Sequence, residues 1–193
     1  MLLQRNPFDY HPLKDGDAHQ RRAYDILNET RLFEFLAGYS PAHIGTIGSC
    51  LHIATSDIDV ACSSGDFNGF KERIYSSFAA EFAVTSYQGS RAGTPYMVFT
   101  IPTSIPIEVY CEEAPTHEQA AYRHFLVTLK LLDLGGEELR SKILALRALG
   151  GKTEPSIMKA LGIHAQDPYK ELLRIADSSA EDLALMVRAA LNK

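Results

Sequence analysis

The chain has few cysteines, no long apolar run and no concentration of basic residues, and each absence excludes a class of protein. Its three cysteines, Cys50, Cys62 and Cys111, include no CxxC pair, so neither a zinc site nor a redox pair is indicated. No run approaches the ~20 apolar residues of a membrane helix. The first segment, MLLQRNPFDYHPL, reaches Arg5 soon after three apolar residues, which is not typical of a signal peptide. We therefore expect a cytoplasmic protein without a membrane partner.

Basic residues are also too few for a strongly cationic surface. Residues 1–113 hold 8 Lys and Arg against 14 Asp and Glu, a net charge of −6, whereas residues 114–193 hold 11 against 10. A protein that grips long nucleic acid through many phosphates needs a concentrated basic surface. Long nucleic acid is therefore not expected as a partner, and a small molecule or a protein is the better candidate for the substrate.

Hydrophobic periodicity predicts an α+β fold. Helical spacing predicts helices over 17–36, with Asp17 as the N-cap, and over 66–78. Apolar runs and alternation predict five strands, at 42–47, 57–62, 82–87, 96–101 and 105–111. The remainder is helical, at 117–134, 137–149, 155–161, 168–176 and 180–191, with the first two helices separated at Gly135-Gly136. We expect an α/β core over 1–113 and a C-terminal helical subdomain over 114–193, packed on that core.

The most informative segment is the one that contains Asp57 and Asp59. Side chains two residues apart on a strand point to the same face, so the two carboxylates lie side by side while Ile58 and Val60 enter the core. Neighbouring carboxylates repel each other unless they are solvated or bridged by a cation. Oxygen ligands of this kind suit Mg²⁺ or Mn²⁺. A pair of solvated aspartates at the end of a strand is the alternative interpretation.

Upstream of this pair, Gly45-Thr46 follows an apolar run. A glycine at a strand end lets a phosphate approach the backbone, and a neighbouring hydroxyl can bond to that phosphate. This order of features resembles the nucleotidyltransferase (DNA polymerase β-like) superfamily, in which a strand is followed by Gly-Ser or Gly-Thr, about ten residues and then Asp-x-Asp. Ten residues, 47 to 56, separate Thr46 from Asp57. Gly48-Ser49 is a second candidate for the same role.

The superfamily resemblance implies a third carboxylate on a later strand. Glu108 is a lone acid between Ile107 and Val109 and matches that position. An exposed place at the edge of the sheet is the alternative explanation for Glu108. If the resemblance holds for Glu108, the metal ligands and catalytic residues are Asp57, Asp59 and Glu108. The resemblance also implies a minimal nucleotidyltransferase fold, with a mixed β-sheet flanked by helices.

A closer resemblance is to the bacterial family DUF4269. Its patterns are similar to Gly45-Thr-Ile47, Ser56-Asp-Ile-Asp59 and Ile107-Glu-Val109, and to the helix start Glu118-Gln-Ala-Ala-Tyr-Arg-His124. Lys152-Thr-Glu-Pro155 and Asp167-Pro-Tyr169 are also similar. The resemblance spans roughly residues 20–175. Cys50 departs from it, because a small loop residue such as Gly is expected there.

Further nucleotide contacts are expected at Gly45, Thr46 and Ser56, and at Tyr122, Arg123 and His124. A helix N-terminus with Arg and His nearby suits an anion, and Tyr122 could stack on a base. Equally, Tyr122 could pack in a core and Arg123 could pair with an acid. Tyr110, His43 and His52 are weaker candidates.

The resulting hypothesis is a Mg²⁺- or Mn²⁺-dependent enzyme that transfers a nucleoside monophosphate from a nucleoside triphosphate to a hydroxyl acceptor. The acceptor could be a small metabolite, an antibiotic-like compound, a protein hydroxyl or an RNA end. An alternative is a catalytically degenerate form of the same fold that binds a nucleotide or a protein. A homodimer formed through the helical segment is compatible with both hypotheses.

Overall fold

The computed structural model describes residues 5–91 and 93–192. The first four residues, which belong to the segment that argued against a signal peptide, lie outside this range. The chain forms two compact units. One consists of Asn6–Gly48 and Ser56–Tyr122, and the other combines Arg5 and Ser49–Thr55 with the described residues from Arg123 onward. No described helix is both long enough and apolar enough to cross a membrane.

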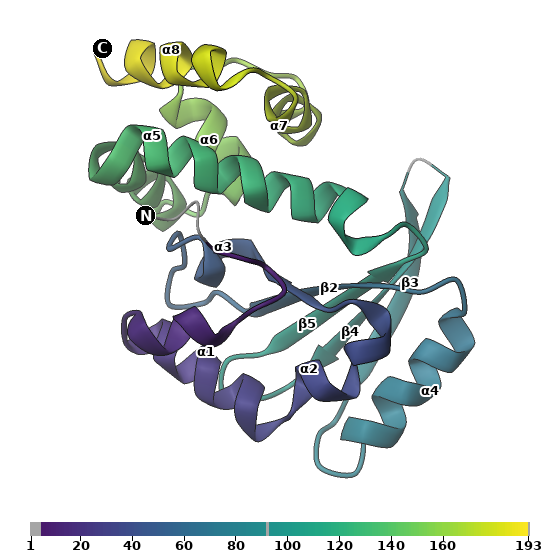
Figure 1. The fold of residues 1–193 in the computed structure, drawn as a ribbon. Helices are drawn as coiled ribbons and strands as arrows, with labels where there is room; N and C mark the ends of the chain where they lie inside the picture. The colour runs from purple at the N-terminus through teal and green to yellow at the C-terminus, as the bar shows by residue number, and fades with distance from the viewer. Residues whose placement is uncertain (1–4, 92, 193) are drawn as a thin grey trace. The chain divides into compact units, whose positions relative to one another are not determined.

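A five-stranded mixed sheet forms the centre of the first unit (Figure 1). Its strands are β1 (Ala42–Ile44), β2 (Ile58–Ser63), β3 (Thr85–Arg91), β4 (Thr94–Ile101) and β5 (Ile107–Glu112). Their order across the sheet is β1-β2-β5-β4-β3. The central pair β2 and β5 is parallel, and the other three pairs are antiparallel. The helices and the mixed sheet confirm the predicted α+β fold class.

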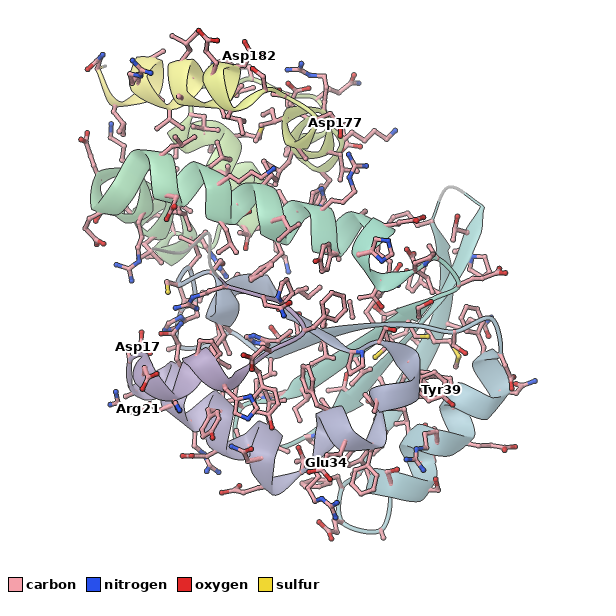
Figure 2. All side chains as sticks on the ribbon, viewed as in Figure 1. Asp17, Arg21, Glu34, Tyr39, Asp177 and Asp182 are labelled. Atoms are coloured by element: carbon pink, nitrogen blue, oxygen red, sulfur yellow. The ribbon has the colours of Figure 1, made fainter. Side chains whose placement is uncertain are left out.

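Helices cover one face of this sheet. They are α1 (Ala18–Glu29), α2 (Leu32–Phe35) and α4 (Phe67–Phe78), which lie on the same side of the strands (Figure 1). Fully buried side chains such as Ile26 and Phe70 pack there against Phe99 of β4 and Val109 of β5. Asp17 is the N-cap of α1, as predicted, and accepts hydrogen bonds from two backbone amides of the first turn (Figure 2).

The second unit is helical. It contains most of α5 (Ala120–Ala148) together with α6 (Thr153–Ala160), α7 (Pro168–Ala176) and α8 (Ala180–Leu191). The predicted separation at Gly135-Gly136 is a kink inside α5, where Gly136 has φ 55°. The segment 49–55 is held by arginines of α5: Arg140 Nε donates to the carbonyl of Cys50 over 3.0 Å, and Arg147 donates to that of Leu51. Cys50 has φ 59°, the conformation that favours the expected glycine.

Two elements are shorter than the sequence predicts. The helix expected over 17–36 divides, because Arg31 adopts a left-handed conformation with φ 50° and separates α1 from α2. The Thr30 hydroxyl also bonds back to the carbonyl of Ile26 over 2.7 Å, an interaction that bends helices. The strand expected over 42–47 ends at Ile44, because Gly45 has φ 76° and begins the short turn α3 (Gly45–Gly48).

The strand predicted over 82–87 is displaced along the chain. β3 begins only at Thr85, and Phe82 still belongs to the turn that follows α4, where its amide bonds to the carbonyl of Phe78. Phe82 and Val84 are apolar because they pack against the core from this turn. β3 itself is a largely exposed edge strand of polar sequence, which periodicity alone does not reveal.

Candidate active site

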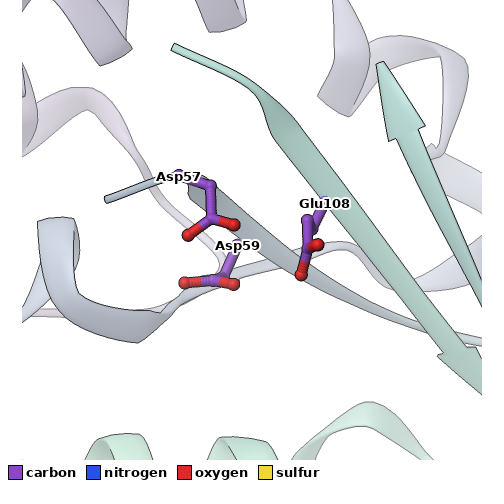
Figure 3. A group of neighbouring side chains, drawn as sticks. All are labelled: Asp57, Asp59 and Glu108. Atoms are coloured by element: carbon purple, nitrogen blue, oxygen red, sulfur yellow. The ribbon is translucent and has the colours of Figure 1, made fainter. Parts of the chain in front are cut away.

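The three predicted carboxylates lie together on the sheet face opposite α1, α2 and α4. Asp59 of β2 and Glu108 of β5 are partners in the parallel register, and each has buried neighbours on both sides along its strand. Asp57 directly precedes β2. Figure 3 shows the three side chains pointing toward one another. One carboxylate oxygen from each lies within 4.8 Å of the others, and all three residues are half-buried.

This donor set fits a magnesium or manganese ion. It offers only carboxylate oxygens, which are hard ligands, and their partial burial strengthens their mutual repulsion unless a cation is present. Ligand oxygens on opposite sides of Mg²⁺ are about 4.2 Å apart, since each lies ~2.1 Å from the ion. The observed limit of 4.8 Å therefore requires only small side-chain adjustments.

Gly45 is required by the position of Asp59. Ile44 and Asp59 are partners across β1 and β2, so the chain turns at Gly45 directly beside the Asp59 carboxylate. A Cβ atom on residue 45 would overlap that carboxylate, and the positive φ of residue 45 also favours glycine. The contact with Asp59 therefore accounts for a glycine at position 45, independently of the predicted approach of a phosphate.

Thr46 and Ser56 connect the turn to the carboxylates. The Thr46 hydroxyl donates to Ser56 Oγ over 3.1 Å, and Ser56 directly precedes Asp57. The predicted phosphate-binding turn and the carboxylate-bearing segment are thus joined by a side-chain hydrogen bond. A contact of Gly45, Thr46 or Ser56 with a nucleotide stays a prediction.

The second predicted group, at the start of α5, engages neighbours within its own units. The Tyr122 ring is 9% exposed and lies 5.7 Å from that of Phe8. Arg123 pairs with Asp177 over 2.6 Å, so it has an acidic partner, as the alternative interpretation expected. His124 Nε2 lies 2.9 Å from the carbonyl oxygen of Tyr169. Their role in nucleotide binding stays a prediction.

Sequence analysis missed a pocket beside the carboxylates. A cavity of about 480 Å³ is lined by Asp59 and Glu108 and also by Tyr87 and Arg91 of β3 and Tyr96 of β4. The weak candidate Tyr110 lines it too, and burial raises the pKa of its phenol above the usual value, assisted by its hydrogen bond to Glu112. The strand predicted over 82–87 ends before Gly89 and Arg91, and this hid the signal, because Tyr87, Gly89 and Arg91 lie two residues apart along β3 and share one face.

A family model and several solved structures match the chain. The model of the family described as "Domain of unknown function (DUF4269)" matches residues 25–175. No curated protein matches significantly. The structure of the GLD-2/RNP-8 complex matches 93% of this chain and 82% of its own, with 10% identity and a TM-score of 0.54.

Two further structures are RNA-modifying enzymes. One, of Cid1 with terminal uridylyl transferase activity, matches 84% of this chain with 15% identity and a TM-score of 0.53. The other, of a cytoplasmic RNA terminal U-transferase, matches 84% with 17% identity and a TM-score of 0.52. The chain covers 51% and 49% of their respective lengths. At such identities the similarity shows the fold. The chain belongs to the DUF4269 family and has the nucleotidyltransferase fold.

Proposed function

We propose that the protein is a metal-dependent nucleotidyltransferase that transfers a nucleoside monophosphate from a nucleoside triphosphate to a hydroxyl acceptor. The observation that carries this proposal is the convergence of Asp57, Asp59 and Glu108 within 4.8 Å on a nucleotidyltransferase fold. A pure binding module has no need to gather three negative charges, because their repulsion costs stability. The solved structures with this fold include a Cid1 poly(U) polymerase with Mg and 3'-dATP bound.

The residues divide the reaction between them. Asp57, Asp59 and Glu108 would hold the metal, and the amides and hydroxyls of Gly45, Thr46 and Ser56 would receive the β- and γ-phosphates. Bound Mg²⁺ would neutralise charge on the attacking and leaving oxygens of an in-line displacement. Glu108 takes the proton from the acceptor hydroxyl while the oxygen of that hydroxyl bonds to the α-phosphorus. At the same time, the bond between the α-phosphorus and the pyrophosphate leaving group breaks.

A thermal-shift experiment tests the metal and nucleotide site. Each of the four nucleoside triphosphates is added with and without Mg²⁺ or Mn²⁺, to the wild type and to the double variant Asp57→Asn/Asp59→Asn. A ligand that binds only the native state at ~100 times its Kd adds about 2.7 kcal/mol. We expect a metal-dependent rise in Tm for at least one nucleotide, and its loss in the double variant.

Asp25→Asn is the matched control, because Asp25 is an exposed aspartate on α1, outside the carboxylate cluster. It should keep the full nucleotide-dependent shift. A shift that survives the double substitution, or the absence of any shift, would contradict the proposed site. A metal-dependent shift without pyrophosphate release for any tested acceptor would instead favour the nucleotide-binding module.

A further inference from the structure

The pocket beside the carboxylates has the features of a built binding site. We call it the tyrosine pocket and define it by Tyr87, Arg91, Tyr96 and Tyr110. In the register of β3, β4 and β5, Tyr96 lies opposite Gly89 on one side and Glu112 on the other, while Tyr110 lies opposite Val98. The pocket thus continues along the same sheet face as Glu108 and reaches from the carboxylates to the outer end of β3.

The rings and the cation of this pocket are arranged around Tyr96. Its ring stacks on that of Tyr110, with centroids 5.3 Å apart and planes inclined by 29°. The Arg91 guanidinium carbon lies 5.9 Å from the Tyr96 centroid. Gly89 gives this ring its space, because a Cβ atom there would contact the ring at 2.6 Å. Tyr87 is 58% exposed and presents a further ring edge-on to Tyr96.

Arg91 is available to a ligand. Within residues 5–91 and 93–192, no carboxylate forms an ion pair with it, and Arg91 is the only Lys or Arg among the described residues that line the pocket. An arginine over an aromatic face is held in place by the cation–π attraction while its outer N–H groups stay able to bind an anion. The pocket therefore offers a ring-stacking surface and one anion-binding group.

The order of the strands assigns this pocket to one of the two substrates. The Gly45 turn follows β1, the carboxylates belong to β2, the residue before it and β5, and the residues that define the tyrosine pocket stand on β5, β4 and β3, at one end of a cavity that also reaches Ile44 of β1. The proposed phosphate-binding turn and the pocket therefore flank the carboxylates on opposite sides. In phosphoryl transfer the attacking oxygen and the leaving group stand roughly in line on opposite sides of the phosphorus. With pyrophosphate beside Gly45, the attacking hydroxyl comes from the side of the pocket.

We propose that the tyrosine pocket binds the acceptor, and that this acceptor is a small hydroxyl compound with a planar ring and one anionic group. The ring lies against Tyr96 or Tyr87, the anion contacts Arg91, and the hydroxyl points toward Glu108. This assignment rests on the proposed nucleotidyl transfer, whereas the class of ligand rests on the pocket alone.

The charge and size of the pocket favour a small acceptor over a polynucleotide. The whole cavity that contains it, carboxylates included, has a volume of about 480 Å³, which is in the range of sites for single small molecules. Arg91 is the one basic residue among the described residues of this lining, which also includes the carboxylates of Asp59, Glu108 and Glu112. A nucleic-acid strand needs instead a row of basic groups along its phosphates. One anionic group is enough to neutralise the charge of Arg91, whereas several phosphates would be repelled by these carboxylates.

A minimal probe of this class is 3-(hydroxymethyl)benzoate, which carries a ring, a carboxylate and a hydroxyl. Its binding to the full chain can be followed by ligand-observed NMR, beside benzyl alcohol, which lacks the anion, and glycolate, which lacks the ring. Arg91→Gln removes the anion contact. Lys71→Gln is the matched control, because Lys71 Nζ also lies 5.9 Å from a tyrosine centroid, that of Tyr75 on α4, outside the pocket.

We expect the probe to bind more tightly than either fragment, and Arg91→Gln to weaken it by about tenfold while Lys71→Gln leaves it unchanged. The metal-dependent shift with nucleoside triphosphates should persist in Arg91→Gln. Loss of that shift in Arg91→Gln would place the nucleotide in the pocket and overturn the acceptor assignment. Equal probe binding by the wild type and Arg91→Gln would overturn the ligand class.

The two proposals fail in different ways. Arg91-dependent binding of the probe, without any metal-dependent nucleotide shift, would refute nucleotidyl transfer and the acceptor role, and it would support the ring-and-anion recognition. Tyr96→Leu provides a second test of the pocket, since it removes the stacking ring and should weaken the probe more than it weakens glycolate. Equal losses for the probe and for glycolate would contradict ring stacking.

Discussion

Replacing Gly45 by alanine would test whether the turn after β1 sets the position of the Asp59 carboxylate. The added Cβ atom meets two separate obstacles. The backbone of residue 45 has φ 76°, a region that L-residues other than glycine enter at a cost. Asp59 also occupies the volume that the methyl group needs, so its carboxylate must leave the position that it has beside Asp57 and Glu108.

The two effects can be separated in magnitude. A left-handed conformation costs a non-glycine residue roughly 1–2 kcal/mol, and the loss of glycine's freedom in the unfolded chain returns ~0.4–1 kcal/mol. We therefore expect the backbone term alone to lower stability by about 1 kcal/mol. For a chain of this length, that corresponds to a fall in Tm of about 2–4 °C. Displacement of one of three carboxylate ligands should weaken metal binding by at least about tenfold.

Gly150→Ala is the matched control. Gly150 has φ 88°, and a Cβ atom built on it has no neighbour within 4 Å among the described residues. Gly150→Ala should show the fall in Tm that the backbone term predicts, and Gly45→Ala should show at least that fall, because only its Cβ atom also meets Asp59. Only Gly45→Ala should lose affinity for Mn²⁺, measured by the EPR signal of the free ion during a titration. The reasoning would be refuted if the two variants bound Mn²⁺ equally well.

Two other predictions concern Arg123 and the cysteines. Because Arg123 is proposed to contact the nucleotide, Arg123→Gln should reduce the nucleotide-dependent rise in Tm. Asp177→Asn removes the exposed partner of Arg123, so it should leave that rise unchanged and lower the stability by less than about 1 kcal/mol. An equal rise in the wild type and in both variants would contradict the nucleotide contact. Burial raises the pKa of the Cys111 thiol to about 12, so only about one molecule in 10⁴ carries its thiolate at pH 8. Iodoacetamide at pH 8 should therefore label the half-buried Cys50 in the native protein, and Cys111 only after unfolding. Peptide mass spectrometry would identify the labelled cysteines. Fast labelling of Cys111 in the native protein would contradict its burial.

The central part of the fold could be predicted because its sequence pattern and its packing agree. β5 alternates throughout between buried apolar residues and half-buried polar ones, and β2 does so from Ile58 to Val60, which is the period-2 pattern of a strand with one face in the core. The same alternation places Asp59 and Glu108 on one face. The expectation that Glu108 joins Asp57 and Asp59 was not contained in the periodicity and came from the resemblance to the superfamily, whereas the pairing of Asp59 with Glu108 in register is a finding of the structure.

The edges of the sheet could not be predicted in the same way. At β1, a single backbone angle at Gly45 ends the strand, and the contact that excludes any side chain there is made by Asp59, which is distant in sequence. At β3, exposure on both faces removes the hydrophobic alternation, while Phe82 and Val84 before it imitate a strand. Local pattern thus fails where tertiary contacts or solvent, and not a buried face, determine the backbone.

The same reasoning explains why the tyrosine pocket escaped sequence analysis while the carboxylates did not. Asp57 and Asp59 are close in sequence, so one strand suffices to bring them together. Arg91 and Tyr96 meet only because β3 and β4 form an antiparallel pair whose register places Gly89, and not Arg91, opposite Tyr96. The absence of a side chain at Gly89 gives the Tyr96 ring its space. Recognising this glycine as the sequence signal for the pocket requires both the bounds of β3 and its pairing with β4, and the predicted strand over 82–87 supplied neither.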